Sequence, residues 1–511
     1  MKTKIHFILS LLVVSTIPSF AQTLSLVKDI NPSGNSNPYY LQNFQNKMYF
    51  VANPGTGYKL YSSDGTTVGT QMVGPTNGSG NLYPMISYNN FFYFNYDDGI
   101  SGAELWKSDG TTAGTVLVKD IVPGSGNSSP RYITGANGKV FFVTNSPNNG
   151  IWVSDGTSSG TQQLISSVIV DGFNNRDYLP SYNGSVYFSG NNGALGLWKS
   201  DGTASGTQLL KNLWVNSYLD GYAIYNGEMY FPGNDTTGTE LWKTNGTTAG
   251  TVLVKNINPT SGSDPEKFLI SNNKIFFVAN DGTNGKELWI SDGTTAGTVM
   301  VKDITPGSSN SEIQSLVEYN GLVYFFIYNN GNRQMYQSDG TAAGTVFIKS
   351  IPFNTVPYTF VFGNKLFFLA KSLGSSYLFM SDGTANGTLQ IAPNISSEDY
   401  SNLQFTNFNS NLYLPCYNGN TGVELNKLTF SNLSISESDL KDFKIYPNPS
   451  SDGVFHLDKL GKITQLEVYD LLGRKVPFKI NNSQLTISDK GLFLLNIQTN
   501  TTKETIKILV K

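Results

Sequence analysis

The stretch ELWKSDGTTAGT, residues 104–115, recurs along this chain and decides its fold. Its Asp, or Asn in one copy, returns every 43 to 47 residues, at Asp64, Asp109, Asp155, Asp201, Asn245, Asp292, Asp339 and Asp382. A second pattern of apolar and aromatic residues keeps the same period in nine copies, from MYFVAN at 48 to LYLPCY at 412. A period near 45 residues with about four strands per unit is typical of β-propeller blades.

One unit, residues 267–304, separates into four short strands: KFLISN, KIFFVAN, KELWIS and GTVMVKDI. Asn-Gly pairs such as Asn137-Gly138 and Asn320-Gly321 stand between the first and second strands of several units. Asn-Gly is a strong hairpin signal because both residues tolerate positive φ. Asp- and Gly-rich loops follow the second strands, so the pattern predicts an all-β chain.

The two ends of the repeat region predict how the propeller closes. LSLVKDI at 24–30 reads as a fourth strand with no blade before it, and VELNKLTF at 423–430 reads as a third strand with no fourth after it. Together they would complete one blade and remove exposed strand edges. We therefore predict a single closed β-propeller of eight to nine four-stranded blades, with nine preferred, followed by a small C-terminal β-sandwich.

The N-terminus has the features of a secretory signal peptide at 1–21. Lys2 and Lys4 precede an apolar run, and Ser19-Phe20-Ala21 offers small residues at the two positions that a signal peptidase reads, which predicts cleavage after Ala21. No later segment approaches the roughly 20 apolar residues of a membrane-spanning helix. The predicted organisation is a propeller at 22–430, a Ser-rich linker at 431–442 and a separate domain at 443–511.

Composition excludes several function classes. Only 14% of the residues are charged and the net charge is -3, so the chain lacks the positive field that binds nucleic acid. The single cysteine, Cys416, lies in an apolar run and reads as a buried thiol. His6 and His456 are the only histidines, so a Ser-His-Asp arrangement or a histidine-ligated zinc cannot form in the propeller. We assign no catalytic residue, although paired carboxylates stay possible.

The repeated residues are expected to be structural. An active site requires a single arrangement of groups, whereas a motif that occurs eight times at a fixed period is explained by a role in every blade. In the SDGT turn, the Asp or Asn can accept hydrogen bonds from backbone N–H groups two residues on, and the Gly supplies positive φ. Five tryptophans share one repeat position and should wedge between blades: Trp106, Trp152, Trp198, Trp242 and Trp289.

Two further sites are hypotheses. One hypothesis is that calcium, the only cofactor predicted as possible, binds at Asp98, Asp235 and Asp281. Asp and Asn side chains lie among glycines at these positions, but the EF-hand spacing is not met. The alternative is that these segments are ordinary turns. A ligand platform is predicted on the face with the loops from strand two to three and from strand four to the next blade. It comprises Trp214, Tyr218, Tyr222, Arg176 and Tyr178, and its alternative is that Trp214 only packs a variant blade junction.

Two resemblances add to these expectations. ELWKSDGT (104–111) and ELWISDGT (287–294) resemble the repeat family named for its ELWxxDGT signature, found in exported proteins of Bacteroidetes-like bacteria. YPNP at 446–449, DLLGRKV at 470–476 and the terminal KILVK resemble the type A sorting domain of the type IX secretion system. That resemblance implies the type IX machinery as a partner, passage across the outer membrane, and release or attachment at the cell surface.

The function expected first is a secreted or cell-surface binding or adhesion module, non-catalytic, for an extracellular glycan or protein. The alternative is an extracellular carbohydrate-active enzyme, a hydrolase or lyase, that uses two carboxylates on the loop face. A purely structural surface protein also stays open.

Overall fold

A computed structural model of the chain describes most of its residues. They are 21–75, 82, 85–145, 148–166, 179–191, 195–213, 221–236, 238–329, 331–353, 355–372, 375–392, 405–417, 420–431, 445–446, 450–457, 463–470, 475–481, 484–498 and 503–510. The expected signal peptide, apart from Ala21, and the expected linker, apart from Ser431, lie outside these residues. No helix occurs among the described residues, which form strands, turns and loops.

The chain divides into two compact units, of which the larger is Leu24–Thr429. The described residues of the larger unit form nine four-stranded sheets, which we call blades 1 to 9 in chain order. The first four blades are β2 (Tyr39–Phe44), β3 (Lys47–Ala52), β4 (Lys59–Ser63), β5 (Gln71–Val73); β6 (Met85–Tyr88), β7 (Phe91–Asp97), β8 (Ala103–Ser108), β9 (Val116–Lys119); β10 (Arg131–Ala136), β11 (Lys139–Thr144), β12 (Gly150–Ser154), β13 (Gln162–Ser166); and β14 (Ser181–Tyr182), β15 (Ser185–Asn191), β16 (Leu195–Ser200), β17 (Gln208–Lys211).

Blades 5 to 8 repeat this order. They are β18 (Ala223–Tyr225), β19 (Glu228–Asp235), β20 (Gly238–Thr244), β21 (Val252–Lys255); β22 (Glu266–Ser271), β23 (Lys274–Asn280), β24 (Lys286–Ser291), β25 (Val299–Lys302); β26 (Gln314–Tyr319), β27 (Leu322–Asn329), β28 (Asn332–Ser338), β29 (Val346–Ile351); and β30 (Thr355–Phe362), β31 (Lys365–Ser372), β32 (Ser375–Ser381), β33 (Leu389–Ala392).

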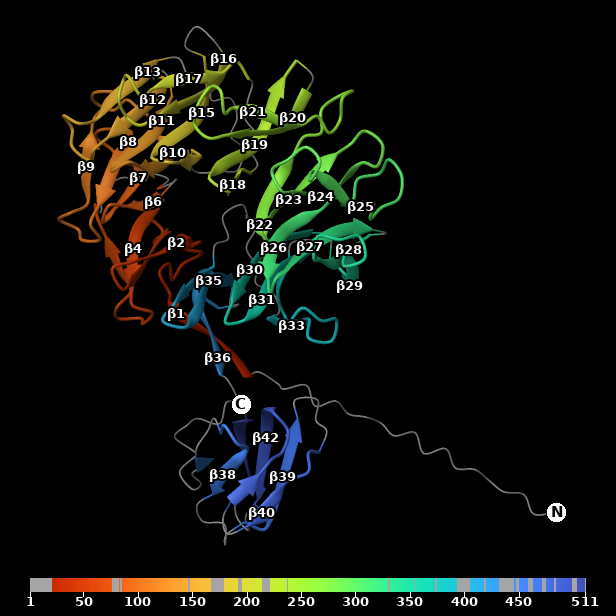
Figure 1. The fold of residues 1–511 in the computed structure, drawn as a ribbon. Coiled ribbons are helices and arrows are strands. Elements are labelled where there is room, and N and C mark those ends of the chain that lie inside the picture. The colour runs from red at the N-terminus through yellow and green to blue at the C-terminus, as the bar shows by residue number, and fades with distance from the viewer. Residues whose placement is uncertain are drawn as a thin grey trace. The chain divides into compact units, whose positions relative to one another are not determined.

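Blade 9 combines the two ends of the unit. Its strands are β34 (Thr406–Phe408), β35 (Asn411–Tyr417), β36 (Val423–Ser431) and β1 (Ala21–Lys28), in the order β1-β36-β35-β34. Figure 1 shows the nine sheets arranged around a central opening, which is a propeller-like fold. Because β1 stands where β5 stands in blade 1, the outermost strand of blade 9 comes from the N-terminal end.

Local turn chemistry explains why these strands form. Asn137 and Gly138 have φ of 50° and 75° between β10 and β11, as a two-residue Asn-Gly hairpin requires. The blades then pack face to face through apolar side chains: Trp106 of β8 lies in one buried cluster with Tyr49 and Val51 of β3. The blades therefore bury apolar faces against their neighbours, as stacked repeat units do.

The C-terminal unit is a small two-sheet domain with its own core. One sheet has the order β37 (Ile445–Tyr446), β38 (Val454–Leu457), β41 (Gln484–Thr486), β40 (Lys479–Asn481), and the other β39 (Gln465–Asp470), β42 (Gly491–Gln498), β43 (Lys503–Val510). Phe455 and Leu485 of the first sheet share a buried cluster with Val468 and Leu495 of the second. Within the described part of the chain, no helix is long and apolar enough to span a membrane.

Candidate functional site

The SDGT segments form the turn between the third and fourth strands of blades 1 to 8. In blade 2, Asp109 Oδ1 accepts hydrogen bonds from Thr111 N at 2.9 Å and Thr111 Oγ1 at 2.7 Å. These bonds lower the pKa of Asp109. A Cβ built on Gly114 would lie 2.0 Å from Asp109 Oδ1, so the second glycine of the motif makes room for that carboxylate.

The other seven copies use the same Thr N–H to carboxylate or amide oxygen bond, at Asp64, Asp155, Asp201, Asn245, Asp292, Asp339 and Asp382. Ser108 Oγ and Thr115 Oγ1 also lie 2.7 Å apart and close the base of the turn in blade 2. The motif's polar groups are thus engaged within each turn. This leaves no catalytic arrangement in the motif.

The five tryptophans at the shared position are between 6% and 8% exposed: Trp106, Trp152, Trp198, Trp242 and Trp289. Trp152 lies in a buried cluster with Tyr93 and Leu105 of the preceding blade, and its Nε1 donates to Asn148 O at 3.3 Å. Rings buried in this way contribute apolar area between blades and offer no open face to a ligand.

A buried glutamate holds the crossover from one blade to the next. Glu104 of β8 is 0% exposed and accepts hydrogen bonds from Ile121 N, Val122 N and Ser128 N at 3.1 to 3.2 Å. Ser128 Oγ also donates to Glu104 Oε2, at 2.5 Å. We call this arrangement the glutamate clamp; it is formed by Glu104, Glu240, Glu287 and Glu424 in blades 2, 5, 6 and 9.

The clamp of blade 9 acts between the two ends of the unit. Glu424 Oε2 accepts from Ile30 N at 3.0 Å, and Ser36 donates from both its N–H and its hydroxyl to the same carboxylate. Thr67 Oγ1 of blade 1 donates to Val27 O at 2.7 Å. The N-terminal segment is therefore fastened to blade 9 and to blade 1.

The remaining five blades carry a different residue at the clamp position. The strand register places Lys59, Gly150, Gly196, Gln334 and Tyr377 there. Lys59 is 2% exposed, its Nζ lies 3.4 Å from Tyr96 Oη, and burial lowers its pKa. The crossovers after these blades are consequently not held by a carboxylate at this position.

Acidic side chains gather where the clamped crossovers enter blades 6 and 7. Asp264 and Glu312 directly follow the clamped serines Ser263 and Ser311, and both acids are exposed. Their φ angles are 46° and 45°, a conformation uncommon for residues other than glycine. The equivalent positions in blades 1 and 3 hold Asn37 and Ser129 with nearly the same φ.

Glu266 adds a third carboxylate at the start of β22. Its oxygens lie 2.7 Å from Lys267 Nζ and 3.5 Å from Lys286 Nζ. In the next blade, Arg333 Nη2 lies 3.6 Å from Glu312 Oε2, and Arg333 Nη1 donates to Glu312 O at 2.9 Å. β22 and β26 pack against each other as neighbouring first strands, and Asp264, Glu266 and Glu312 lie at or just before the starts of these two strands, on the loop face.

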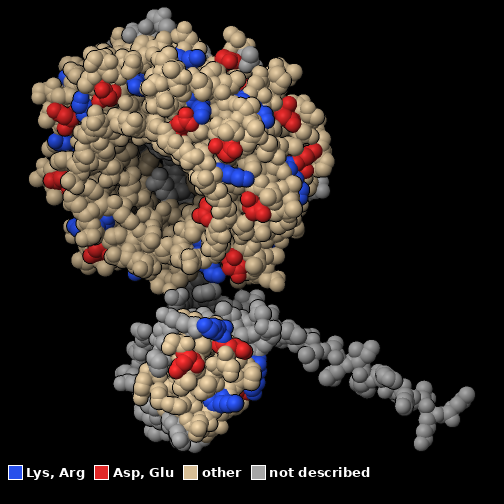
Figure 2. All heavy atoms as spheres, viewed as in Figure 1, with Lys and Arg blue, Asp and Glu red and all other residues tan. Residues whose placement is uncertain are grey.

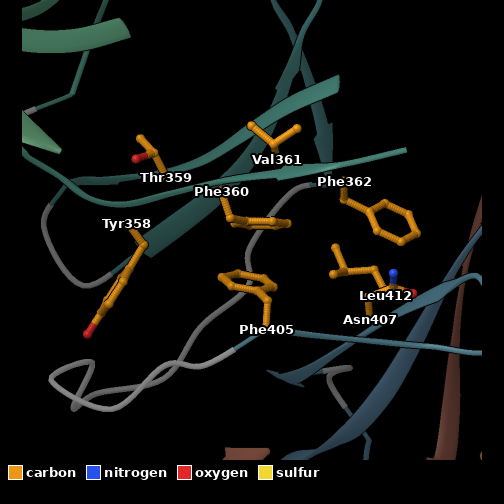
Figure 3. Close-up of a pocket in the computed structure, with 8 residues that line it drawn as sticks. All are labelled: Tyr358, Thr359, Phe360, Val361, Phe362, Phe405, Asn407 and Leu412. Atoms are coloured by element: carbon orange, nitrogen blue, oxygen red, sulfur yellow. The ribbon is translucent and has the colours of Figure 1, made fainter. Parts of the chain in front are cut away.

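Figure 2 shows a central hollow in the larger unit, with acidic and basic side chains scattered over the visible surface rather than gathered by sign. A pocket of about 360 Å³ lies between β30 and the β34–β35 hairpin. Its walls include Phe360 and Phe405, whose rings stack with centroids 4.6 Å apart, as Figure 3 shows. Its lining contains no charged side chain among the described residues, so it has no acid for catalysis.

The predicted ligand platform falls mostly outside the described residues. Trp214, Tyr218, Arg176 and Tyr178 all lie there. Tyr222 is described, and it packs against the buried cluster that contains Tyr187 and Trp242.

The described residues around the predicted calcium positions form ordinary turns rather than a cluster of ligands. Asp98 Oδ1 accepts from Ile100 N and Ser101 N, and Asp281 Oδ1 accepts from Thr283 N and Asn284 N, as in ordinary Asx turns. Asp235 is the last residue of β19. Over the described ranges, no three His, Cys, Asp or Glu side chains group so that they could hold a metal ion.

Comparisons with known proteins identify the C-terminal unit. Residues 444–511 match the family described as a secretion system C-terminal sorting domain. This segment is a type IX secretion sorting domain, and it directs export to the cell surface or into the medium. A comparison with curated proteins finds no match.

Three of the solved structures that are similar to this chain are enzymes. A puromycin hydrolase is 12% identical with a TM-score of 0.37, over 78% of this chain and 61% of that one. Oligopeptidase B from Leishmania major is 10% identical with a TM-score of 0.39, over 82% and 55%. A prolyl endopeptidase is 7% identical with a TM-score of 0.39, over 78% and 55%. The chain thus spans less than two thirds of each, and at this identity the likeness concerns the fold.

The expectation of a non-catalytic binding or adhesion module is corrected by this comparison, because the similar structures are a hydrolase and peptidases. The three acids of blades 6 and 7 were not singled out from the sequence, since the clamps that precede Asp264 and Glu312 join residues far apart in the chain.

Proposed function

We propose that this chain is an exported hydrolase of an extracellular polysaccharide, with its catalytic carboxylates among Asp264, Glu266 and Glu312. The observation that carries the proposal is that these acids lie at or just before the starts of two neighbouring first strands, and that clamped serines directly precede two of them, Asp264 and Glu312. Glycoside hydrolysis needs two carboxyl groups on opposite sides of one bond, one as acid and one as base or nucleophile.

The clamps support this assignment because they fix the backbone directly before two of the acids. Glu240 accepts from Ser263 Oγ at 2.6 Å, and Glu287 accepts from Ser311 Oγ at 2.5 Å. Asp264 N also donates to Thr239 O at 3.1 Å. Acids on a rigid backbone keep the geometry that a two-carboxylate mechanism depends on.

Glu266 and Glu312 form ion pairs with different basic side chains. Glu266 is held between Lys267 and Lys286, and Glu312 is held by Arg333, which is 4% exposed. Such pairs fix the rotamer of a carboxylate that must point at a substrate. Serine-peptidase chemistry is not proposed, because His6 and His456 are the only histidines in the chain.

Several finer features belong to the same proposal. The larger unit would be one closed nine-bladed ring of ELWxxDGT repeats, the signal peptide would be removed after Ala21, and residues 431–442 would link the ring to the sorting domain. Trp214, Tyr218, Tyr222, Arg176 and Tyr178 would contact the polymer, and calcium at Asp98, Asp235 or Asp281 stays a prediction. An unchanged melting temperature after chelation would contradict the calcium sites.

The test is release of new reducing ends from a panel of neutral and acidic polysaccharides by the full chain. Asp264→Asn, Glu266→Gln and Glu312→Gln are compared with Glu318→Gln, an exposed acid on β26 outside the proposed site. We expect the loss of one catalytic carboxyl group to lower kcat roughly 100-fold or more, and Glu318→Gln to leave it unchanged. Full activity in all three site variants would refute the assignment.

A further inference from the structure

The glutamate clamp places a titratable group at the root of four crossovers on the loop face. Glu287 is 0% exposed, and its carboxylate receives Ile304 N at 3.2 Å, Thr305 N at 3.4 Å and Ser311 Oγ at 2.5 Å. The titratable groups that interact with it are Asp303 in the crossover and Tyr336 in the next blade. We propose that the clamp is a pH-sensitive lock, which holds the crossover closed in acid and loosens it when the glutamate ionises.

The hydrogen bonds of the clamped serine can rearrange when the glutamate takes up a proton. Ser311 Oγ lies 2.5 Å from Glu287 Oε1 and 2.9 Å from Thr305 Oγ1. A hydroxyl can donate or accept, so when Glu287 is protonated its O–H donates to Ser311 Oγ, and the Ser311 hydroxyl turns to Thr305 Oγ1. The protonated clamp then keeps a complete set of hydrogen bonds.

The serines of the other three clamps also have an alternative acceptor, which in each case is a main-chain oxygen. The hydroxyls of Ser36, Ser128 and Ser263 lie 3.3, 3.4 and 3.5 Å from the carbonyl oxygens of Val423, Ala103 and Thr239. Each hydroxyl can therefore turn from its carboxylate to a main-chain oxygen. For Glu424, the interacting titratable groups are Asp29 and Tyr61, which stand where Asp303 and Tyr336 stand around Glu287.

Burial sets the direction of the effect. Desolvation raises the pKa of Glu287 to about 7, and it also raises the pKa of Glu104, Glu240 and Glu424. An opened crossover exposes the glutamate to water, where its pKa returns to the ordinary glutamate value of 4.5. The closed form binds the proton more tightly, so closure is strongest below pH 4.5 and weakens as pH rises to about 7.

The size of the pH effect on crossover opening follows from the pKa values of Glu287 in the closed and open forms. Between pH 5.5 and pH 8, a carboxyl group with pKa about 7 when closed and 4.5 when open raises the opening constant on the order of 25-fold. The crossover after blade 7 provides an internal control, because Gln334 occupies the clamp position there and does not titrate.

Hydrogen exchange of the full chain tests the proposal directly. After correction for intrinsic exchange rates, we expect amides of residues 301–313 to lose roughly 25-fold protection between pH 5.5 and pH 8, and amides of 349–356 to change little. In Glu287→Gln, protection of 301–313 should no longer depend on pH, while residues 254–265 under Glu240 keep their dependence. Equal wild-type protection at both pH values would overturn the lock, whether or not the chain shows hydrolase activity.

Discussion

Glu424 offers the sharpest test of how the two ends of the larger unit are joined. In Glu424→Gln, one amide oxygen can still accept from Ser36, but the amide nitrogen would face Ile30 N, which lies 3.0 Å from Glu424 Oε2. Two donors would then oppose each other in a buried site. A buried donor left without an acceptor costs about 1–3 kcal/mol.

The neighbouring contacts limit the loss of stability in Glu424→Gln. Ser36 N also donates to Val423 O at 3.1 Å, so it keeps a partner when Glu424 changes. The net penalty is therefore that of Ile30 N plus the weakened Ser36 bonds. We expect the free energy of unfolding to fall by about 2–4 kcal/mol.

Urea unfolding of the full chain measures this loss, and Glu240→Gln is the matched control. Glu240 makes an equivalent clamp with Ile257 N, Asn258 N and Ser263 Oγ, but its partners lie within the chain rather than at its end. Both variants should lose similar stability, whereas only Glu424→Gln should speed proteolytic trimming of residues 24–36. Wild-type stability in Glu424→Gln, or equal trimming in both variants, would refute the argument that Glu424 fastens the N-terminal segment.

Further predictions concern the turns and the thiol. Gly114→Ala should lower stability by about 1–3 kcal/mol, because its Cβ would meet Asp109 at 2.0 Å, whereas Gly34→Ala should change the melting temperature little, since the nearest atom to its Cβ is 3.4 Å away. Asp109→Asn should be nearly neutral in a thermal melt, because Asn245 makes the same turn, and Asp109→Ala should cost about 1 kcal/mol; equal losses in the two variants would contradict this role. Burial raises the pKa of Cys416 to about 12, so a thiol reagent at pH 8 should label it only after unfolding, and rapid labelling of folded protein would contradict its burial.

Turn chemistry and periodicity predicted much of the fold because they act over a few residues. Asn137-Gly138 specifies its hairpin locally, and β1 was expected beside β36 because the strand types at the two ends were incomplete. The clamp was missed because its partners are 17 to 24 residues apart within a blade and 394 apart at Glu424 and Ile30. A usable signal existed: KDI or KNI follows the three Glu-Leu-Trp copies at Glu104, Glu240 and Glu287, and the KDI at 28–30 follows β1, the strand that completes the blade of Glu424.

The candidate site was harder to predict for the same reason. Asp264, Glu266 and Glu312 are unremarkable in the sequence, and only the packing of β22 beside β26 brings them to one region. The aromatic residues chosen from the sequence were selected as departures from the repeat, and that criterion finds unusual positions without locating carboxylates. Reading which residues follow the clamped serines would have found two of the three acids.

The most direct measurement of the central claim is the rate of reducing-end release from polysaccharides by wild type, Asp264→Asn, Glu266→Gln, Glu312→Gln and Glu318→Gln. The proposed function predicts turnover by wild type and Glu318→Gln and a roughly 100-fold or greater loss in at least two of the three site variants, with unchanged melting temperatures. Absence of turnover on every polysaccharide, or turnover that survives all three site substitutions, would contradict it.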